Sequence, residues 1–316
     1  MRAVLIRDKN VIVDEIPDPR PAAGDVVVDV VAAGLNAADL HQVAGQYPAP
    51  PGWPTDTPGM ELAGRIAEVG SRVEGWQRGD RVMALVGGGA HAEKAVVRAS
   101  ALLSLADSAA FLMAGGFPEA FTTAWDALVS QAGLIAGERV LVTGATGGVG
   151  TAAIQVAAAT GAHVVASVRD SASHEKLTAL VPGLEIAAAG DEAAHGPFDV
   201  ILELVGGDDS MARVGSLAIG GRIVVIGVGA GARVPISLGR LMAVRGRVMG
   251  STLRARTDEE KGVIARSIAR TLVPGFAAGR LSVPIDSTFP LESAADAYAR
   301  MAQSGKFGKV VLTTGA

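Results

Sequence analysis

A glycine-rich turn between an apolar segment and an alanine-rich segment constrains the fold of this 316-residue chain more than any other feature. Residues 140–142 read Val-Leu-Val, as a short buried strand would, and residues 143–150 read Thr-Gly-Ala-Thr-Gly-Gly-Val-Gly. Gly144 permits the tight turn, Gly147 gives a pyrophosphate room to approach the backbone, and Gly150 allows close helix–strand packing. We interpret the turn as the phosphate-binding loop of a dinucleotide site, formed by Gly144, Thr146, Gly147, Gly148 and Val149.

The residues after the turn complete a strand–helix–strand unit. We expect a helix from Gly148 to about Thr160, whose free N–H groups and positive dipole end would face the phosphates. Gly161 would end this helix, and a second strand would follow from His163 to Ser167. The unit spans about 30 residues, which is the context that makes a glycine motif a dinucleotide fingerprint.

Arg169 predicts which dinucleotide binds. In NAD-binding folds, an Asp or Glu about 20 residues beyond the glycines accepts a hydrogen bond from the ribose 2′-hydroxyl. Arg169 stands near that position, and a guanidinium pairs instead with a 2′-phosphate, to which Ser167 could add a hydroxyl contact. We therefore expect NADPH rather than NADH. The alternative is a solvated arginine at a strand end, with Asp170 neutralising its charge.

The composition excludes several classes of function. Hydrophobic residues make up 49% of the chain, enough for a large core, and the length suggests two domains. The net charge of -4 and the scattered Lys and Arg residues argue against a nucleic-acid partner or an anionic membrane surface. The absence of cysteine excludes disulfides and thiolate nucleophiles and fits a reducing, cytoplasmic location. Early charges argue against a signal peptide, and the glycines within 140–168 argue against a membrane span.

The chain divides into two regions with different patterns of predicted secondary structure. Short β-rich runs separated by Pro and Gly, up to about residue 117, are typical of a mostly antiparallel barrel. From residue 118, helices and strands alternate, which predicts an α/β fold with a doubly wound parallel Rossmann sheet. The last strand is expected to return to the first domain, which gives domains 1–117 with 254–316, and 118–253. The expected strands are 11–16, 25–31, 64–69, 81–85, 93–98, 140–142, 163–167, 184–187, 198–205, 222–226, 247–250 and 309–313, and the expected helices are 122–130, 148–160, 173–180, 210–217, 258–272 and 293–302.

Further short motifs occur along nearly the whole chain. They include Ala-Gly-Leu-Asn-Ala-Ala-Asp-Leu at 33–40, Gly-Gln-Tyr-Pro at 45–48, Pro-Gly-Met-Glu-Leu-Ala-Gly at 58–64, Gly-Ser-Thr-Leu-Arg at 250–254 and Gly-Lys-Val-Val-Leu at 308–312. Together with the glycine turn, they resemble the medium-chain dehydrogenase/reductase superfamily, in particular its zinc-independent NADPH:quinone oxidoreductases of the p53-inducible type. The resemblance implies a GroES-like catalytic domain beside the Rossmann domain.

The resemblance also bears on metal binding. Zinc alcohol dehydrogenases of this superfamily carry a Cys where Asn36 stands, a His where Met60 stands, and a lobe of four Cys. None of these ligands is present, and the five histidines, which show no paired spacing, are expected in the surface or core. Zinc needs N or S ligands in a tetrahedral array, so we expect no metal. Alcohol oxidation is poorly supported without a Lewis acid to hold the alkoxide. Reduction of an acceptor that is already electrophilic needs less activation.

Two catalytic residues are implied by the resemblance. Asn36 would lie beside the nicotinamide ribose and carboxamide. Tyr47 would line the acceptor pocket, with a hydroxyl able to donate to a carbonyl oxygen. An alternative exists for each residue: Asn36 is also a typical turn residue after a strand, and Tyr47 could serve only as a wall.

Other cofactor contacts are implied in the same way. Thr123 would touch the cofactor, although a threonine at a helix start can serve only as a cap. The turn from Phe307 to Lys309 would close over the cleft, and Glu61 would be a structural acceptor. The backbones that pass near the nicotinamide would be those of Gly227, Val228 and Leu253.

Two departures from the family pattern concern the 2′-phosphate site. Many relatives place Asn-Tyr after the third strand, where the Tyr packs at the phosphate or adenine, but residues 186–190 here read Ile-Ala-Ala-Ala-Gly. Residues 191–197 are also too few for the usual crossover helix. The phosphate clamp is therefore expected to rest on Arg169 and Ser167, with Lys176 as a further candidate.

The leading hypothesis is an NADPH-dependent reductase that passes hydride to a small-molecule acceptor, a quinone or an enone. The second is an enoyl-thioester reductase of secondary metabolism, which would need a compact basic patch that the sequence does not show. The third is a low-turnover NADPH-binding protein that resembles lens crystallins. A homodimer is expected from the resemblance and from the apolar strand 222–226, if that strand borders the sheet.

Overall fold

The structure is a computed structural model that describes residues 1–208 and 210–315. The chain divides into two compact units, Met1–Thr122 together with the segment from Arg254 onward, and Thr123–Leu253. The first division falls inside helix α3 (Pro118–Trp125) rather than at residue 117. In the described ranges, none of the helices is long and apolar enough to span a membrane.

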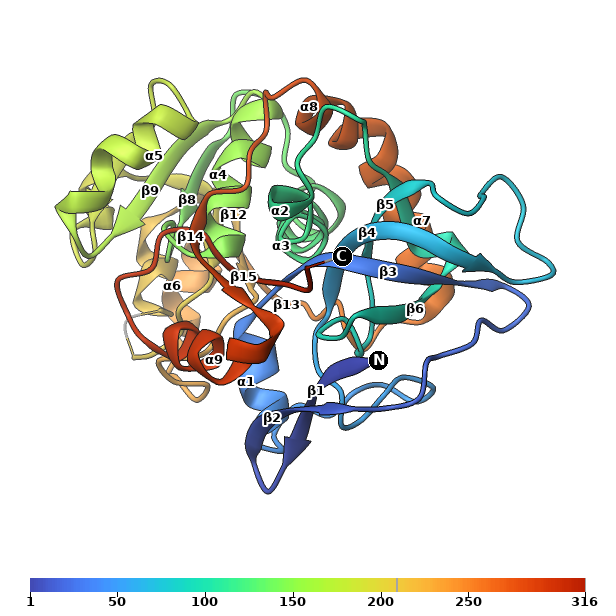
Figure 1. The fold of residues 1–316 in the computed structure, drawn as a ribbon. Helices are drawn as coiled ribbons and strands as arrows, with labels where there is room; N and C mark the ends of the chain where they lie inside the picture. The colour runs from blue at the N-terminus through green and yellow to red at the C-terminus, as the bar shows by residue number, and fades with distance from the viewer. Residues whose placement is uncertain (209, 316) are drawn as a thin grey trace. The chain divides into compact units, whose positions relative to one another are not determined.

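The unit Thr123–Leu253 contains a six-stranded sheet in the order β10-β9-β8-β11-β12-β13 (Figure 1). Every neighbouring pair is parallel, which confirms the predicted doubly wound Rossmann sheet. The order reverses between β8 and β11, and such sheets bind ligands outside the carboxyl ends of the strands at that point. The strands are β8 (Arg139–Val142), β9 (His163–Val168), β10 (Glu185–Ala188), β11 (Phe198–Glu203), β12 (Leu217–Val225) and β13 (Arg247–Gly250).

The glycine turn connects β8 to helix α4 (Gly148–Ala159). Gly144 has a φ of 58°, in the left-handed region that favours glycine. A Cβ on Gly150 would lie 2.3 Å from the carbonyl oxygen of Gly144, so only glycine lets the first turn of α4 approach the preceding loop this closely. The backbone geometry therefore accounts for two of the glycines that the sequence singled out.

The other unit is built on a mostly antiparallel sheet in the order β14-β15-β3-β4-β5-β7, and β6 also pairs with β3. Strand β15 pairs antiparallel with β3, with Val311 opposite Gly34, and the red C-terminal strand lies beside blue β3 in Figure 1. The last strand thus joins the sheet of the first unit, as expected. The strands are β1 (Arg2–Arg7), β2 (Asn10–Glu15), β3 (Asp25–Gly34), β4 (Glu61–Val69), β5 (Arg81–Leu85), β6 (Lys94–Arg98), β7 (Leu102–Ser104), β14 (Ile285–Pro290) and β15 (Lys309–Thr313).

Each unit has its own apolar core. In the first unit, Val28, Leu62 and Val82 belong to one buried cluster, and in the second, Leu141 and Ile201 belong to another. Besides α3 and α4, the helices are α1 (Ala37–Val43), α2 (Phe111–Ala114), α5 (His174–Leu180), α6 (Leu238–Ala243), α7 (Asp258–Thr271), α8 (Val273–Ala277) and α9 (Ala294–Ala302).

One prediction about the second unit is wrong. The helix expected over 210–217 is a short 3-10 turn, Ala212–Ser216, because Gly215 disfavours a helix and Leu217 already pairs with Phe198 of β11. The strand expected over 222–226 is confirmed as part of β12, but it does not border the sheet, because β13 pairs with it. The edge of the sheet on this side is therefore β13.

Helix α3 also differs from its prediction. It begins at Pro118, where a proline needs no N–H partner, and it continues as a π-helical turn over Asp126–Gln131. Thr123 therefore lies inside the helix, and the alternative that it caps the helix start is wrong.

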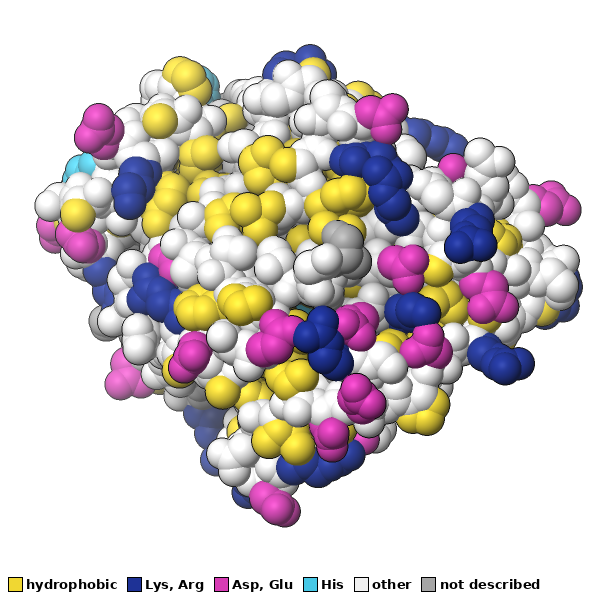
Figure 2. Space-filling view, viewed as in Figure 1, with side chains coloured by type: hydrophobic (Ala, Val, Ile, Leu, Met, Phe, Trp, Pro, Cys, Tyr) yellow, Lys and Arg dark blue, Asp and Glu magenta, His cyan; other side chains and the backbone are white. Residues whose placement is uncertain are grey.

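Charged side chains of both signs are interspersed on the face drawn in Figure 2, without a large field of either sign. Nucleic-acid-binding surfaces concentrate Lys and Arg on one face or along one helix. The face drawn in Figure 2 has no such concentration.

Candidate active site

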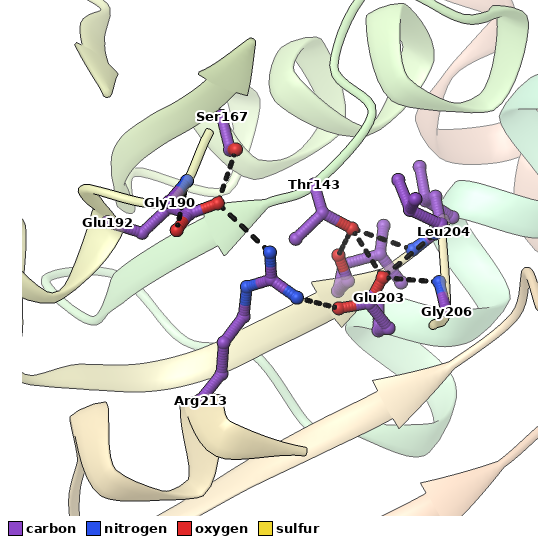
Figure 3. Close-up of polar contacts among 10 residues, drawn as sticks. Thr143, Ser167, Gly190, Glu192, Glu203, Leu204, Gly206 and Arg213 are labelled. Carbon is purple, nitrogen blue, oxygen red and sulfur yellow. Dashed lines mark hydrogen bonds and ion pairs between the residues drawn. The ribbon is translucent and has the colours of Figure 1, made fainter. Parts of the chain in front are cut away.

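In the second unit, the carboxylate of Glu203 ties the loop after β11 to the start of the glycine turn (Figure 3). Its Oε1 accepts hydrogen bonds from Thr143 Oγ1 at 3.0 Å, from Val205 N at 2.8 Å and from Gly206 N at 2.9 Å. Thr143 Oγ1 in turn accepts from the backbone N–H of Leu204 at 2.8 Å. The ends of β8 and β11 are therefore held together by buried polar contacts at the switch point of the sheet.

Arg213 extends this network to the ends of β9 and β10. Its Nη1 lies 2.9 Å from Glu203 Oε2, and its Nη2 lies 3.0 Å from Glu192 Oε1. Glu192 Oε1 also accepts from Ser167 Oγ at 2.7 Å, and its Oε2 accepts from the backbone N–H of Gly190 at 3.0 Å. Sequence reasoning missed Glu192, Glu203 and Arg213, although it noted the short connection in which Glu192 lies.

Glu192 is ionised at neutral pH. Burial by itself would raise the pKa of this carboxyl, but the hydrogen bond from Ser167 and the charge of Arg213 outweigh burial and lower the pKa below its usual value. A negative charge is thus fixed among the ends of β9 and β10.

The residues predicted to hold the 2′-phosphate lie in different environments. Ser167 is buried, and its hydroxyl donates to Glu192 rather than facing an open site. Arg169 is exposed just beyond the end of β9, and Lys176 is exposed on α5. Asp170 accepts a hydrogen bond from the backbone N–H of Ala172, so its carboxylate is used in the turn that follows β9.

The loop predicted to pass near the nicotinamide packs closely on the end of β11. A Cβ on Gly227 would lie 2.1 Å from the carbonyl oxygen of Leu204, so this position requires glycine. A Cβ on Gly206 would lie 2.7 Å from Val228 Cα, and the side chain of Val228 is partly exposed. Leu253 follows the end of β13 and is half-buried.

In the first unit, Asn36, Glu61 and Lys309 converge because strand β3 pairs with both β4 and β15. Asn36 follows β3, Glu61 begins β4 and Lys309 begins β15. Lys309 Nζ lies 2.5 Å from Glu61 Oε1 and donates to Asn36 Oδ1 at 2.5 Å, while Asn36 Nδ2 donates to Glu61 Oε1 at 3.0 Å. All three side chains are buried.

Glu61 accepts from several donors and has little space around it. Its Oε2 accepts from the backbone N–H of Glu119, in the first turn of α3, at 2.9 Å. A Cβ on Gly34 would lie 2.4 Å from Glu61 Oε1, so the carboxylate reaches its position only because residue 34 is glycine. Glu61 is therefore a structural acceptor, as expected.

His91 lies beside this cluster, fully buried. Its Nε2 donates to the carbonyl oxygen of Gly34 at 3.2 Å, and its Nδ1 accepts from the hydroxyl of Tyr298 at 2.9 Å. Burial, the largest influence, lowers the pKa of His91, so the ring is neutral near pH 7. The ring is a core histidine with both nitrogens used, in agreement with the sequence-based interpretation.

Tyr47 is held by Arg254, a residue to which the sequence analysis assigned no role. The Arg254 guanidinium lies 5.0 Å from the centre of the Tyr47 ring and donates to the Tyr47 carbonyl oxygen at 2.9 Å. It also donates to Gln42 Oε1 at 2.6 Å and to the carbonyl oxygen of Gly87 at 2.9 Å. The proline-rich loop that carries Tyr47 is thus fixed through both ring and backbone.

The side chains around Glu61 do not fit a zinc ion as its ligands. The described residues contain no group of three or more His, Asp or Glu side chains that could hold a metal. The charge of the Glu61 carboxylate is balanced by the Lys309 ammonium. A carboxylate can bind zinc, but an ammonium has no lone pair to offer, and neither a Cys nor a His belongs to the cluster of Asn36, Glu61 and Lys309.

The sequence matches two families, and the two matched regions together cover most of the chain. Residues 22–131 match the alcohol dehydrogenase GroES-like domain, and residues 160–312 match the zinc-binding dehydrogenase family.

Similar proteins extend the match to nearly the full length. "Quinone oxidoreductase-like protein 2" from Bos taurus is 31% identical over 99% of this chain and 92% of its own. The crystal structure of quinone oxidoreductase from Thermus thermophilus, also solved in complex with NADPH, has a TM-score of 0.85 at 34% identity and covers 99% of this chain and 100% of that one. A phenolphthiocerol/phthiocerol polyketide synthase protein from Mycobacterium tuberculosis is 31% identical over 95% of this chain, but over only 14% of its own length. The chain therefore belongs to the quinone oxidoreductase family of the medium-chain dehydrogenase/reductase superfamily.

Proposed function

We propose that the protein is a zinc-independent, NADPH-dependent oxidoreductase that transfers hydride to a quinone or to the activated C=C bond of an enone. The observation that carries the proposal is the cluster of Asn36, Glu61 and Lys309, in which an ammonium rather than a metal cation balances the buried carboxylate. A bound nicotinamide would supply the hydride, so the protein has to position reactants and exclude water rather than activate a metal-bound alcohol.

The contacts around Asn36 support its proposed role beside the nicotinamide. Lys309 donates to its Oδ1, and its Nδ2 donates to Glu61, so the amide plane is fixed without freedom to rotate. Lys309 would hold the Asn36 amide in place through this hydrogen bond and would also place a positive charge near the cofactor. We further assign cofactor contacts to the glycine turn, to Thr123 and to the backbones of Gly227, Val228, Leu253 and Phe307.

Tyr47 is proposed to line the acceptor pocket. Reduction of a quinone requires one hydride and then a proton, and the proton can come from water or from the Tyr47 hydroxyl. Contact with Arg254 fixes the ring and backbone of Tyr47, so this side of the proposed acceptor pocket would keep its shape. A quinone is already electrophilic, so the hydroxyl is expected to contribute less than the position of the nicotinamide.

An enoyl-thioester reductase is the second candidate. The specific observation in its favour is the similarity of this chain to one segment of a much longer polyketide synthase chain. Comparing a crotonyl thioester with a simple quinone, in one NADPH oxidation assay, distinguishes the two acceptors directly.

Replacing Asn36 with Ala should lower kcat by about 100-fold, because a misplacement of about 1 Å at the reacting atoms has an effect of this size. Tyr47→Phe keeps the ring over Arg254 and should lower kcat by less than about tenfold, since a water can replace the hydroxyl at the pocket. Both are measured at saturating NADPH with one quinone. A Tyr47→Phe protein slower than Asn36→Ala would contradict these assignments.

Arg169 is proposed to select NADPH through its 2′-phosphate. Arg169→Asp replaces an attractive charge with a repulsive one and should weaken NADPH binding at least about tenfold while leaving NADH little changed. Arg280→Asp, the same change at an exposed position of the first unit, is the matched control. Fluorescence titration of both cofactors checks this. An equal loss for NADPH and NADH would show that Arg169 has a structural role only.

We also propose a homodimer through the edge strand β13. Exposed apolar side chains occur on this strand and on helix α6, which precedes it in the chain: Leu238 is 64% exposed, Met242 is 76% exposed and Val248 is 37% exposed. Unpaired backbone groups of an edge strand invite pairing with a second copy. Met242→Asp should shift the protein from dimer to monomer in light scattering at micromolar concentration. The control is Ile135→Asp, because Ile135 is also apolar and is 64% exposed, and this variant should leave the dimer intact. A monomeric parent protein would rule out the dimer.

A further inference from the structure

The carboxylate of Glu192 lies in a cradle of three hydrogen-bond donors at the ends of β9 and β10 (Figure 3). The donors are the Ser167 hydroxyl at 2.7 Å, the Arg213 guanidinium at 3.0 Å and the backbone N–H of Gly190 at 3.0 Å. Glu192 is only 5% exposed. A hydroxyl, a guanidinium and a backbone amide are the groups with which proteins commonly bind phosphate. The Glu192 carboxylate therefore occupies a set of donors that could bind an anion.

The short connection between β10 and β11 explains how Glu192 reaches this place. The connection contains a single 3-10 turn, Glu192–His195, in place of a full crossover helix. Ala189 N donates to the carbonyl oxygen of Val168, which keeps the start of the connection against the end of β9. Glu192 therefore folds back over the strand ends instead of pointing away from them.

This position matters for the cofactor because of where the second strand of a Rossmann sheet ends. In such folds the residues just beyond that strand recognise the 2′ substituent of the adenosine ribose. Ser167 is the next-to-last residue of β9, and Arg169 follows the strand directly. Of the residues proposed to bind a 2′-phosphate, Ser167 is thus already occupied by a fixed negative charge, and Arg169 follows it two positions later.

We propose that Glu192 is a specificity-determining residue for the 2′ position of the cofactor, and that its carboxylate limits the preference for NADPH over NADH by occupying the donors of Ser167 and Arg213. The inference rests on the proposed nicotinamide cofactor. A 2′-phosphate near the end of β9 meets Arg169 as an attractive charge and Glu192 as a repulsive one. Removal of the carboxylate frees two donors and removes the repulsion.

The test uses nucleotide binding rather than turnover. Calorimetric titration of the full chain with 2′,5′-ADP and with ADP measures the effect of the 2′-phosphate alone. In Glu192→Gln, the affinity for 2′,5′-ADP should rise at least about tenfold while the affinity for ADP changes less than about threefold, since the variant removes a repulsive charge beside the 2′-phosphate and the loss of such a repulsion has this magnitude. Glu185→Gln is the matched control, because Glu185 is the first residue of β10, at the opposite end of that strand, where it pairs with Arg139 and His195.

A second set of variants separates the proposal from a loss of folding. Glu192→Ser is smaller and leaves room for water to satisfy Arg213, so it should show the same gain if Glu192→Gln unfolds. Adding Ser167→Ala to Glu192→Ser should remove part of the gain, because one of the freed donors is lost. Thermal unfolding shows that each variant compared is folded.

The outcomes are distinct. A ratio of 2′,5′-ADP to ADP affinity that stays within about threefold of the parent value in a folded Glu192 variant would overturn the inference and leave the proposed function standing. If the parent protein binds neither nucleotide, nor NADPH or NADH, the proposed function itself is wrong.

Discussion

The first unit's site depends on the buried ion pair between Lys309 and Glu61. The two charges come from strands far apart in the chain, and they meet because β3 pairs with β4 on one side and with β15 on the other. Removing one partner of such a pair leaves an uncompensated buried charge, which typically costs about 3–5 kcal/mol. Asn36 bridges the pair, so the orientation of its amide follows from the pair.

A comparable network organises the second unit. Arg213 joins Glu192, at the ends of β9 and β10, to Glu203, which holds the loop after β11. Arg213 therefore connects the region assigned to the 2′ end of the cofactor with the loop after β11, against which the Gly227–Val228 loop assigned to the nicotinamide packs. Because its carboxylate partners are buried, a change at either glutamate is expected to affect the other end through the shared guanidinium.

The parts of the fold that local pattern determines could be predicted from the sequence. Glycines at required φ values and apolar runs placed β8, α4 and β9 within a residue or two, and the final strand Lys309–Thr313 and strand Arg247–Gly250 have the predicted bounds. The helix expected over 210–217 failed because strand pairing of Leu217 outweighs a weak helical pattern interrupted by Gly215.

The polar contacts of the candidate site could be predicted only in part. Asn36, Lys309 and Ser167 were singled out, but the partners of Ser167 were not, because a hydrogen bond between residues on separate strands leaves no local pattern. Arg254 stood in a recognised motif, yet its contacts with Tyr47 and Gln42 appear only once strand and loop are folded together.

Turnover of metal-free protein decides whether this chain reduces its acceptor without a metal. The protein is dialysed against a strong chelator, its zinc content is measured by mass spectrometry, and NADPH oxidation is followed with a simple benzoquinone. We expect an unchanged rate of NADPH oxidation at far less than one zinc per chain. A rate that disappears with the metal and returns when zinc is added would contradict this expectation.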